Sequence, residues 1–101
     1  MAIAEITIIP LGTKTPSVSK YLARAFRALR DEKNIKYELT SMGTILEGDL
    51  EDILRVVRNM HENTFGGEIM RVLTTIKIDD RRDKTSTMKG KIDSLLKELE
   101  R

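Results

Sequence analysis

Residues 35–47 read IKYELTSMGTILE, and this stretch decides the fold. Both of its halves are rich in β-branched and aromatic residues, which favour extended strands. Ser41, Met42 and Gly43 interrupt the pattern between the halves, as is typical of a hairpin or a bulged turn. The stretch therefore predicts two short strands joined by a turn.

A helix and a long strand are expected after this pair. Asp49 offers an N-cap, and apolar residues then recur at helical spacing until Gly66 and Gly67. Residues 68–79 return to a period of two, which is typical of a strand. At about 11 residues this last strand exceeds the usual strand length, so we expect it to pair or pack with another chain.

A strand and a helix are expected before the pair. Residues 2–9 alternate between two faces, and Pro10, which lacks a backbone donor, predicts that the strand ends near this residue. The following loop leads to Ser17, a suitable N-cap, and an amphipathic helix is expected from there to about Lys33. A third amphipathic stripe predicts a C-terminal helix at about residues 86–100.

The predicted order β-α-β-β-α-β-α contains the split βαβ arrangement of ferredoxin-like domains. We therefore expect residues 1–101 to form one α+β domain, a ferredoxin-like βαββαβ sandwich with an additional C-terminal helix. In this sandwich both crossover helices cover one face of a four-stranded antiparallel sheet. The open face mixes polar groups with apolar ones such as Ile9 and Leu73, so the third helix or a second subunit must cover it.

Composition argues against several classes of partner. The formal net charge of +2 is too small for strong nonspecific attraction to nucleic acid, and the alternating charges of residues 79–84 are expected to pair with one another. RNA-binding sheets need exposed aromatic residues, which the first and last strands lack. The sequence shows no signal peptide, no membrane-spanning stretch and no cysteine, so we expect a cytoplasmic protein that binds neither membranes nor nucleic acid.

Few residues point to catalysis. The single histidine, His61, lies close to a helical apolar stripe, where a structural role is favoured over a metal or catalytic role. Thr13 and Ser17 precede a helix and either hold an anion or form a loop and cap. Glu47 and Arg71 either pair across the sheet or line a polar pocket. We expect no cofactor and no metal site.

The chain contains, in this order, the segments IPLGT at 9–13, SVS at 17–19, MGTILEGD at 42–49 and RVLTTIKID at 71–79, followed by Arg82-Asp83-Lys84 and Lys91. Together these segments resemble the small thiamine-binding protein family found in bacteria, archaea and yeast. MGTILEGD is the most specific of them. The resemblance implies a ferredoxin-like domain that pairs through its sheets into dimers and tetramers, with no catalytic activity established for the family. Some relatives bind the hydroxymethylpyrimidine part of thiamine.

An aminopyrimidine needs a carboxylate or carbonyl for its nitrogen atoms and hydroxyl groups for its other polar atoms. Thr44, Glu47 and Thr75 supply these groups, and Arg71 lies on the same strand as Thr75. The resulting hypothesis is a non-catalytic homo-oligomer, built as a dimer of dimers, that binds thiamine or its hydroxymethylpyrimidine part. The site is expected at the open sheet face or at a subunit junction.

Three other functions stay open at this point. A regulatory module would hold an anion or metabolite with Thr13, Ser17 and Arg71. A purely structural interaction protein would need no ligand. An acylphosphatase-like hydrolase is less favoured, because such enzymes place an essential arginine in the loop after the first strand, where this chain has only Lys14.

Overall fold

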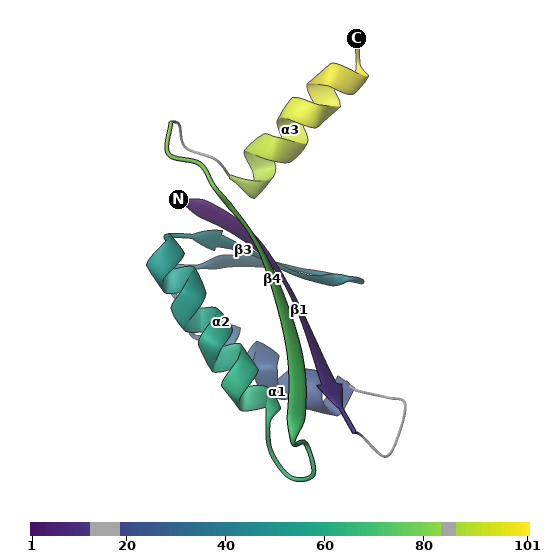
Figure 1. The fold of residues 1–101 in the computed structure, drawn as a ribbon. Coiled ribbons are helices and arrows are strands. Elements are labelled where there is room, and N and C mark those ends of the chain that lie inside the picture. Colours follow the sequence, from purple (N-terminus) through teal and green to yellow (C-terminus); the bar gives the residue numbers. More distant parts are fainter. Residues whose placement is uncertain (13–18, 84–86) are drawn as a thin grey trace.

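A four-stranded antiparallel sheet with the strand order β2-β3-β1-β4 carries two helices on one face (Figure 1). The computed structural model describes residues 1–12, 19–83 and 87–101. Its elements are β1 (Ala2–Leu11), α1 (Ser19–Arg30), β2 (Lys36–Thr40), β3 (Gly43–Gly48), α2 (Leu50–Thr64), β4 (Arg71–Asp80) and α3 (Met88–Leu99). This order and this sheet confirm the predicted ferredoxin-like α+β fold.

The core lies between the sheet and the pair α1 and α2. Every second residue of β1, from Ala2 to Ile8, points toward the helices and is buried. From the other side, Leu29 of α1 and Ile53 and Met60 of α2 are almost fully buried against them. Burying apolar side chains on one stripe of each helix and one face of the sheet supplies most of the driving force for this packing.

The first strand ends near Pro10, as predicted. β1 reaches Leu11, one residue further, and Pro10 itself stands opposite Val72 of β4. On its other side β1 pairs with β3 only from Ala2 to Ile6. A missing N–H on that free edge removes no ladder hydrogen bond, which is why the strand tolerates a proline there.

Two predicted boundaries were wrong. The first helix ends at Arg30 and not near Lys33, because the Glu32 N–H bonds to the Leu29 carbonyl in a tighter turn (3.2 Å). Its predicted start at Ser17 lies outside the described residues. The last strand begins at Arg71 and not at residue 68, because the Ile69 N–H bonds back to the Gly66 carbonyl (3.0 Å) and closes a turn.

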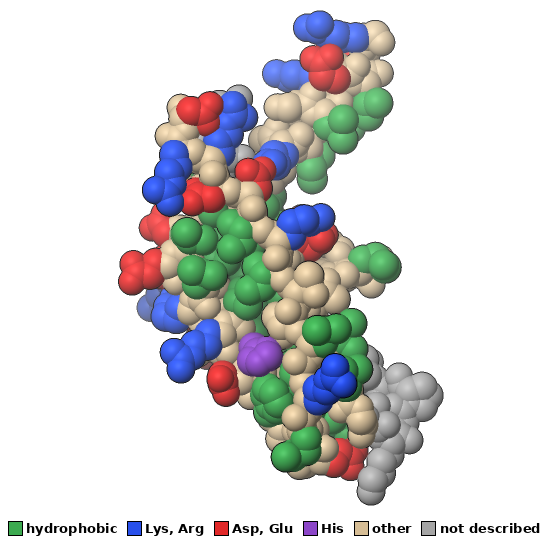
Figure 2. Space-filling view, viewed as in Figure 1, with side chains coloured by type: hydrophobic (Ala, Val, Ile, Leu, Met, Phe, Trp, Pro, Cys, Tyr) green, Lys and Arg blue, Asp and Glu red, His purple; other side chains and the backbone are tan. Residues whose placement is uncertain are grey.

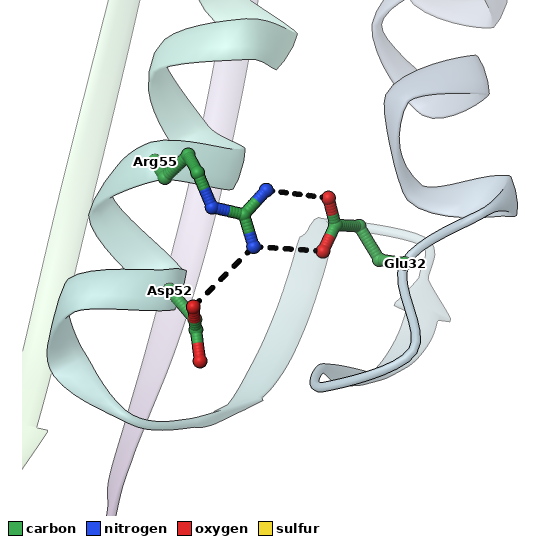
Figure 3. A network of polar contacts seen from close by, with 3 residues as sticks. All are labelled: Glu32, Asp52 and Arg55. Atoms are coloured by element: carbon green, nitrogen blue, oxygen red, sulfur yellow. Dashed lines mark hydrogen bonds and ion pairs between the residues drawn. The ribbon is translucent and has the colours of Figure 1, made fainter.

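A polar network ties the end of α1 to α2 (Figure 3). The Arg55 guanidinium donates to both carboxylate oxygens of Glu32, at 2.6 and 2.9 Å, and to Asp52 at 3.4 Å. The hydrogen bond from Arg55 lowers the pKa of Glu32 and raises that of Arg55. This bidentate contact fixes the loop that leads from α1 into β2.

The helix α3 extends away from the sheet and helix layers (Figure 1), and no residue of α3 is fully buried. Four of its apolar side chains are between 51% and 71% exposed: Ile92, Leu95, Leu96 and Leu99. In the part of the chain that the structure describes, no helix is long and apolar enough to cross a membrane.

We predict that Glu32→Gln destabilises the fold in a pH-dependent manner. Because the folded state lowers the pKa of Glu32, its contribution is present above the ordinary value of 4.5 and is lost as pH falls through the folded-state pKa. Denaturant unfolding of both proteins from neutral pH to about pH 3 should therefore show a difference that shrinks on acidification.

Glu98→Gln provides the control, since Glu98 meets Arg101 only at 3.9 Å on the surface. This variant should unfold like the wild type throughout. A Glu32→Gln difference that stays constant over the whole pH range would contradict the assigned ion pair.

Candidate functional site

A cavity of about 460 Å³ lies between α1, the second half of β1 and the β2–β3 hairpin. Its volume falls within the range of ordinary small-molecule sites. The residues that line it come from all three elements and from α2: Ile6, Thr7, Ile8, Ile9, Leu22, Phe26, Leu39, Thr40, Ser41, Met42, Gly43, Thr44 and Met60. It is the site we consider for binding.

Unequal strand lengths create this cavity. β1 and β4 pair along ten residues each, whereas β3 has six residues and accompanies β1 only as far as Ile6. Beyond Ile6 the hairpin side of β1 has no β3 partner, so this strand edge offers backbone N–H and C=O groups to other molecules. The cavity lies beside the unpaired stretch.

The hairpin turn closes one side of the cavity. The Thr40 hydroxyl donates to the Gly43 carbonyl (2.7 Å) and accepts from the Met42 N–H (3.3 Å). Gly43 comes so close to β1 that a Cβ atom there would lie 2.9 Å from the Ile6 carbonyl oxygen. A glycine is therefore required if the hairpin is to approach β1 in this way.

The cavity combines apolar walls with hydroxyl groups. Apolar side chains such as Leu22, Phe26 and Leu39 line it, and the side-chain polar groups in the lining are hydroxyls. Thr44 is 2% exposed, and its side chain makes no hydrogen bond to the other described residues. An aromatic ring between apolar walls, with polar ring atoms held by hydroxyl and backbone groups, is the chemistry that such a space accommodates.

The structure separates the residues that the sequence analysis grouped. Thr44 points to the helix side of β3 and lines the cavity, whereas Glu47, three positions on, points to the open face. Thr75 and Arg71 also lie on the open face, opposite Thr7 and Leu11. Thr13 and Ser17 lie outside the described residues.

Glu47 and Thr75 share a face without being neighbours. Glu47 stands opposite Ile3 on one side of β1, and Thr75 stands opposite Thr7 on the other side. Ile3 and Thr7 are four positions apart in β1, so Glu47 and Thr75 are separated by roughly 13 Å along the strand direction. Lys77, between these levels, pairs with Glu5 at 3.3 Å.

Glu47 has a different set of contacts. Its side chain is 3% exposed, and its Oε1 atom accepts the backbone N–H of Met88 at 2.9 Å. Thr87 caps the same helix by accepting from the Gly90 N–H at 2.9 Å. A carboxylate at the N-terminus of α3 is favourable, because the free N–H groups there carry partial positive charge. Glu47 thus anchors α3 to the sheet.

Sequence reasoning missed most of the cavity lining. Leu22 and Met60 belong to the apolar stripes of the first two predicted helices, which indicate core positions, and Phe26 gave no signal of its own. The available signal was the difference between a first strand of at least eight residues and the short strands of the hairpin. That difference predicts that part of the first strand has no neighbour on the hairpin side.

The single histidine lies outside the cavity, between α2 and β4 (Figure 2). The Nδ1 atom of His61 is 2.7 Å from the Thr74 hydroxyl, and its ring meets that of Phe65 edge to face at 5.3 Å. Within the described ranges no three His, Cys, Asp or Glu residues gather in a way that would hold a metal ion. The charged run after β4 pairs with itself, as Arg81–Asp83 and Arg82–Asp80.

Comparison with known proteins gives a consistent result. A family model described as thiamine-binding protein matches residues 4–96. The chain is 50% identical to the UPF0045 protein YqgV of Bacillus subtilis over 99% of both chains. It is 42% identical to a UPF0045 protein of Methanothermobacter thermautotrophicus, covering 98% of this chain and 100% of the relative.

Two solved structures share the fold. The hypothetical protein MJ1052 of Methanocaldococcus jannaschii superposes with a TM-score of 0.83 at 39% identity, covering 93% of this chain and 94% of the other. A Thermotoga maritima protein, described as a candidate for thiamine biosynthesis or salvage, superposes with a TM-score of 0.75 at 20% identity. That match covers 93% of this chain and 97% of the other, and at this identity it shows the fold alone.

We predict that Glu47→Ala releases the start of α3 from the sheet. Losing the buried acceptor should cost about 1 to 3 kcal/mol, and hydrogen exchange at the Met88 amide should become faster. Glu47→Gln retains a carbonyl acceptor and should preserve most of the protection. Glu5→Ala, which removes the exposed carboxylate that pairs with Lys77, is the control. Unchanged exchange at Met88 in Glu47→Ala would contradict the anchor.

Proposed function

The chain belongs to the thiamine-binding protein family, and on that premise we propose that it is a non-catalytic protein that binds thiamine or its hydroxymethylpyrimidine part as a homo-oligomer. A small-molecule-binding role follows from the family. The ligand, its position and the assembly are our proposals, and each has its own support.

The observation that carries the ligand proposal is the cavity beside the hairpin. An aminopyrimidine is flat and apolar on both faces, and polar atoms surround its edge. The apolar side chains of Leu22, Phe26 and Leu39 match the faces of the ring, and the Thr44 hydroxyl and the free edge of β1 match its polar rim. We therefore propose this cavity, and not the open face near Glu47, as the place of the pyrimidine.

A binding role without catalysis fits the chemistry of the described residues. The hydroxyl groups of the cavity have no base beside them among its lining residues, and His61 is engaged with Thr74 elsewhere. The family description names binding of thiamine and no reaction. We propose the cytoplasm as the location, since a chain without cysteine suits a reducing compartment.

Three exposed apolar surfaces support an oligomer. Ile9 (42% exposed) and Leu73 (52%) remain uncovered on the open face, because α3 contacts only the end of the sheet near Glu47. Apolar side chains also gather between α2 and β4 and along α3 (Figure 2). Between α2 and β4 they include Leu54, Ile76 and Ile78. We propose that copies of this chain cover these surfaces in a dimer of dimers.

The same surfaces favour a second candidate, a structural interaction protein without a ligand. A regulatory anion site at Thr13, Ser17 and Arg71 is a third candidate, although only Arg71 lies among the described residues. The structural interaction protein requires no small molecule at all, and the regulatory module requires an anion but no pyrimidine. Calorimetry with thiamine, hydroxymethylpyrimidine and inorganic phosphate separates all three.

We predict that Thr44→Val weakens binding of hydroxymethylpyrimidine by about 1 to 3 kcal/mol, because one polar atom of the ring loses its partner at a nearly buried position. Thr75→Val is the matched control: it removes the same hydroxyl group from the open face, outside the cavity, and should leave the affinity unchanged. Isothermal titration calorimetry measures both. A loss of affinity in Thr75→Val but not in Thr44→Val would move the site to the open face. A wild type that binds neither thiamine nor hydroxymethylpyrimidine would refute the ligand proposal.

We also predict that the wild type has four times the mass of one chain in light scattering at micromolar concentration. Leu73→Lys should reduce that mass, because it places a charge on an apolar surface that the assembly would remove from water. Met70→Lys, at an 86% exposed position in the turn before β4, should leave the assembly intact. A monomeric wild type would contradict the proposal.

A further inference from the structure

A second cavity, of about 340 Å³, lies between α1 and β2. It is lined by Ala23, Phe26, Arg27, Arg30, Tyr37 and Leu39. Phe26 and Leu39 also line the cavity beside the hairpin, so the two cavities share these side chains as a common wall. The second cavity is therefore a direct neighbour of the first.

Loose cover over β2 explains this second cavity. Tyr37 and Leu39 point to the helix side of the sheet, since they stand opposite Leu46 and Thr44 of β3. Both remain about half exposed, at 46% and 55%, because α1 packs against α2 and not onto β2. These two half-exposed side chains form the β2 side of the second cavity.

Two arginines without an ion-pair partner distinguish the second cavity. Arg27 and Arg30 are one helical turn apart, which places them on the same side of α1. Among the described residues neither makes an ion pair, whereas Arg55, Arg81 and Arg82 each pair with a carboxylate.

The nearest carboxylate of β2 does not neutralise these arginines. Glu38 stands opposite Ile45 and so points to the other face of the sheet. Two guanidinium groups lining one concave space provide several N–H donors in a planar arrangement that suits the oxygen atoms of a phosphate.

We propose that the ligand is a phosphate monoester, with its aminopyrimidine ring in the cavity beside the hairpin and its phosphate between Arg27 and Arg30. This inference rests on the proposed function, because it assumes that the ring occupies the first cavity. The Phe26 side chain lies at the junction, where the ring and the phosphate are joined. The Tyr37 side chain borders the phosphate end.

Calorimetry with hydroxymethylpyrimidine, its phosphate monoester and inorganic phosphate tests this directly. The wild type should bind the monoester about tenfold more tightly than the free alcohol, since two partly exposed charge-assisted contacts are added. The double variant Arg27→Gln/Arg30→Gln should lose this preference and keep its affinity for the alcohol. Arg58→Gln, an exposed arginine of α2 that lines neither cavity, removes one charge as a control and should keep the preference.

The outcomes separate this inference from the proposed function. Equal binding of the monoester and the alcohol by the wild type would overturn the inference and leave the pyrimidine site intact. A preference that is lost in Arg71→Gln, but kept in the double variant, would also overturn it by placing the phosphate at the open face. Binding of neither organic compound would refute the proposed function itself, and binding of inorganic phosphate alone would do the same.

Discussion

The unequal pairing of β1 on its two sides is the constraint on which the rest of this structure depends. β4 accompanies β1 from Ala2 to Leu11, whereas β3 leaves it after Ile6. The long pair fixes the sheet and gives α1 and α2 a surface on which to pack. The short pair leaves one edge of β1 open in the middle of the molecule. This free edge belongs to a central strand of the sheet, and it borders the cavity beside the hairpin.

Several local features follow from that mismatch. The strand passes through Pro10 because a proline on the free edge removes no hydrogen bond. The hairpin turn ends close to Ile6, which is why Gly43 can carry no side chain. At the opposite end of the sheet, where β1 has neighbours on both sides, the buried Glu47 anchors α3. The MGTILEGD segment therefore contributes to two separate features. Gly43 and Thr44 line the cavity, and Glu47 anchors α3 at the other end of the strand.

Hydrophobic periodicity predicted each helix and strand in the correct order, because each buries one face and that face repeats along the sequence. It could not predict which residues share a site. Thr44 and Glu47 are close in the sequence, yet strand geometry sends them to opposite faces, and Thr75 reaches the level of Thr7 only through the pairing register. Register depends on contacts between distant segments, so residue type alone cannot reveal it. Phe26 illustrates the same limit. It is an apolar residue of α1, and it lines a cavity only because the hairpin does not extend along the second half of β1.

The most direct test of the account is to locate the ligand by nuclear magnetic resonance, with amide spectra recorded during a titration with hydroxymethylpyrimidine. We expect the largest shift changes at the amides that border the free edge of β1 and the hairpin, namely Thr7, Ile8, Met42 and Gly43. The amides of Glu47 and Met88 should change little, because they lie at the other end of the sheet. Changes concentrated at Glu47, Met88 or Thr75, with the hairpin amides unaffected, would contradict the account.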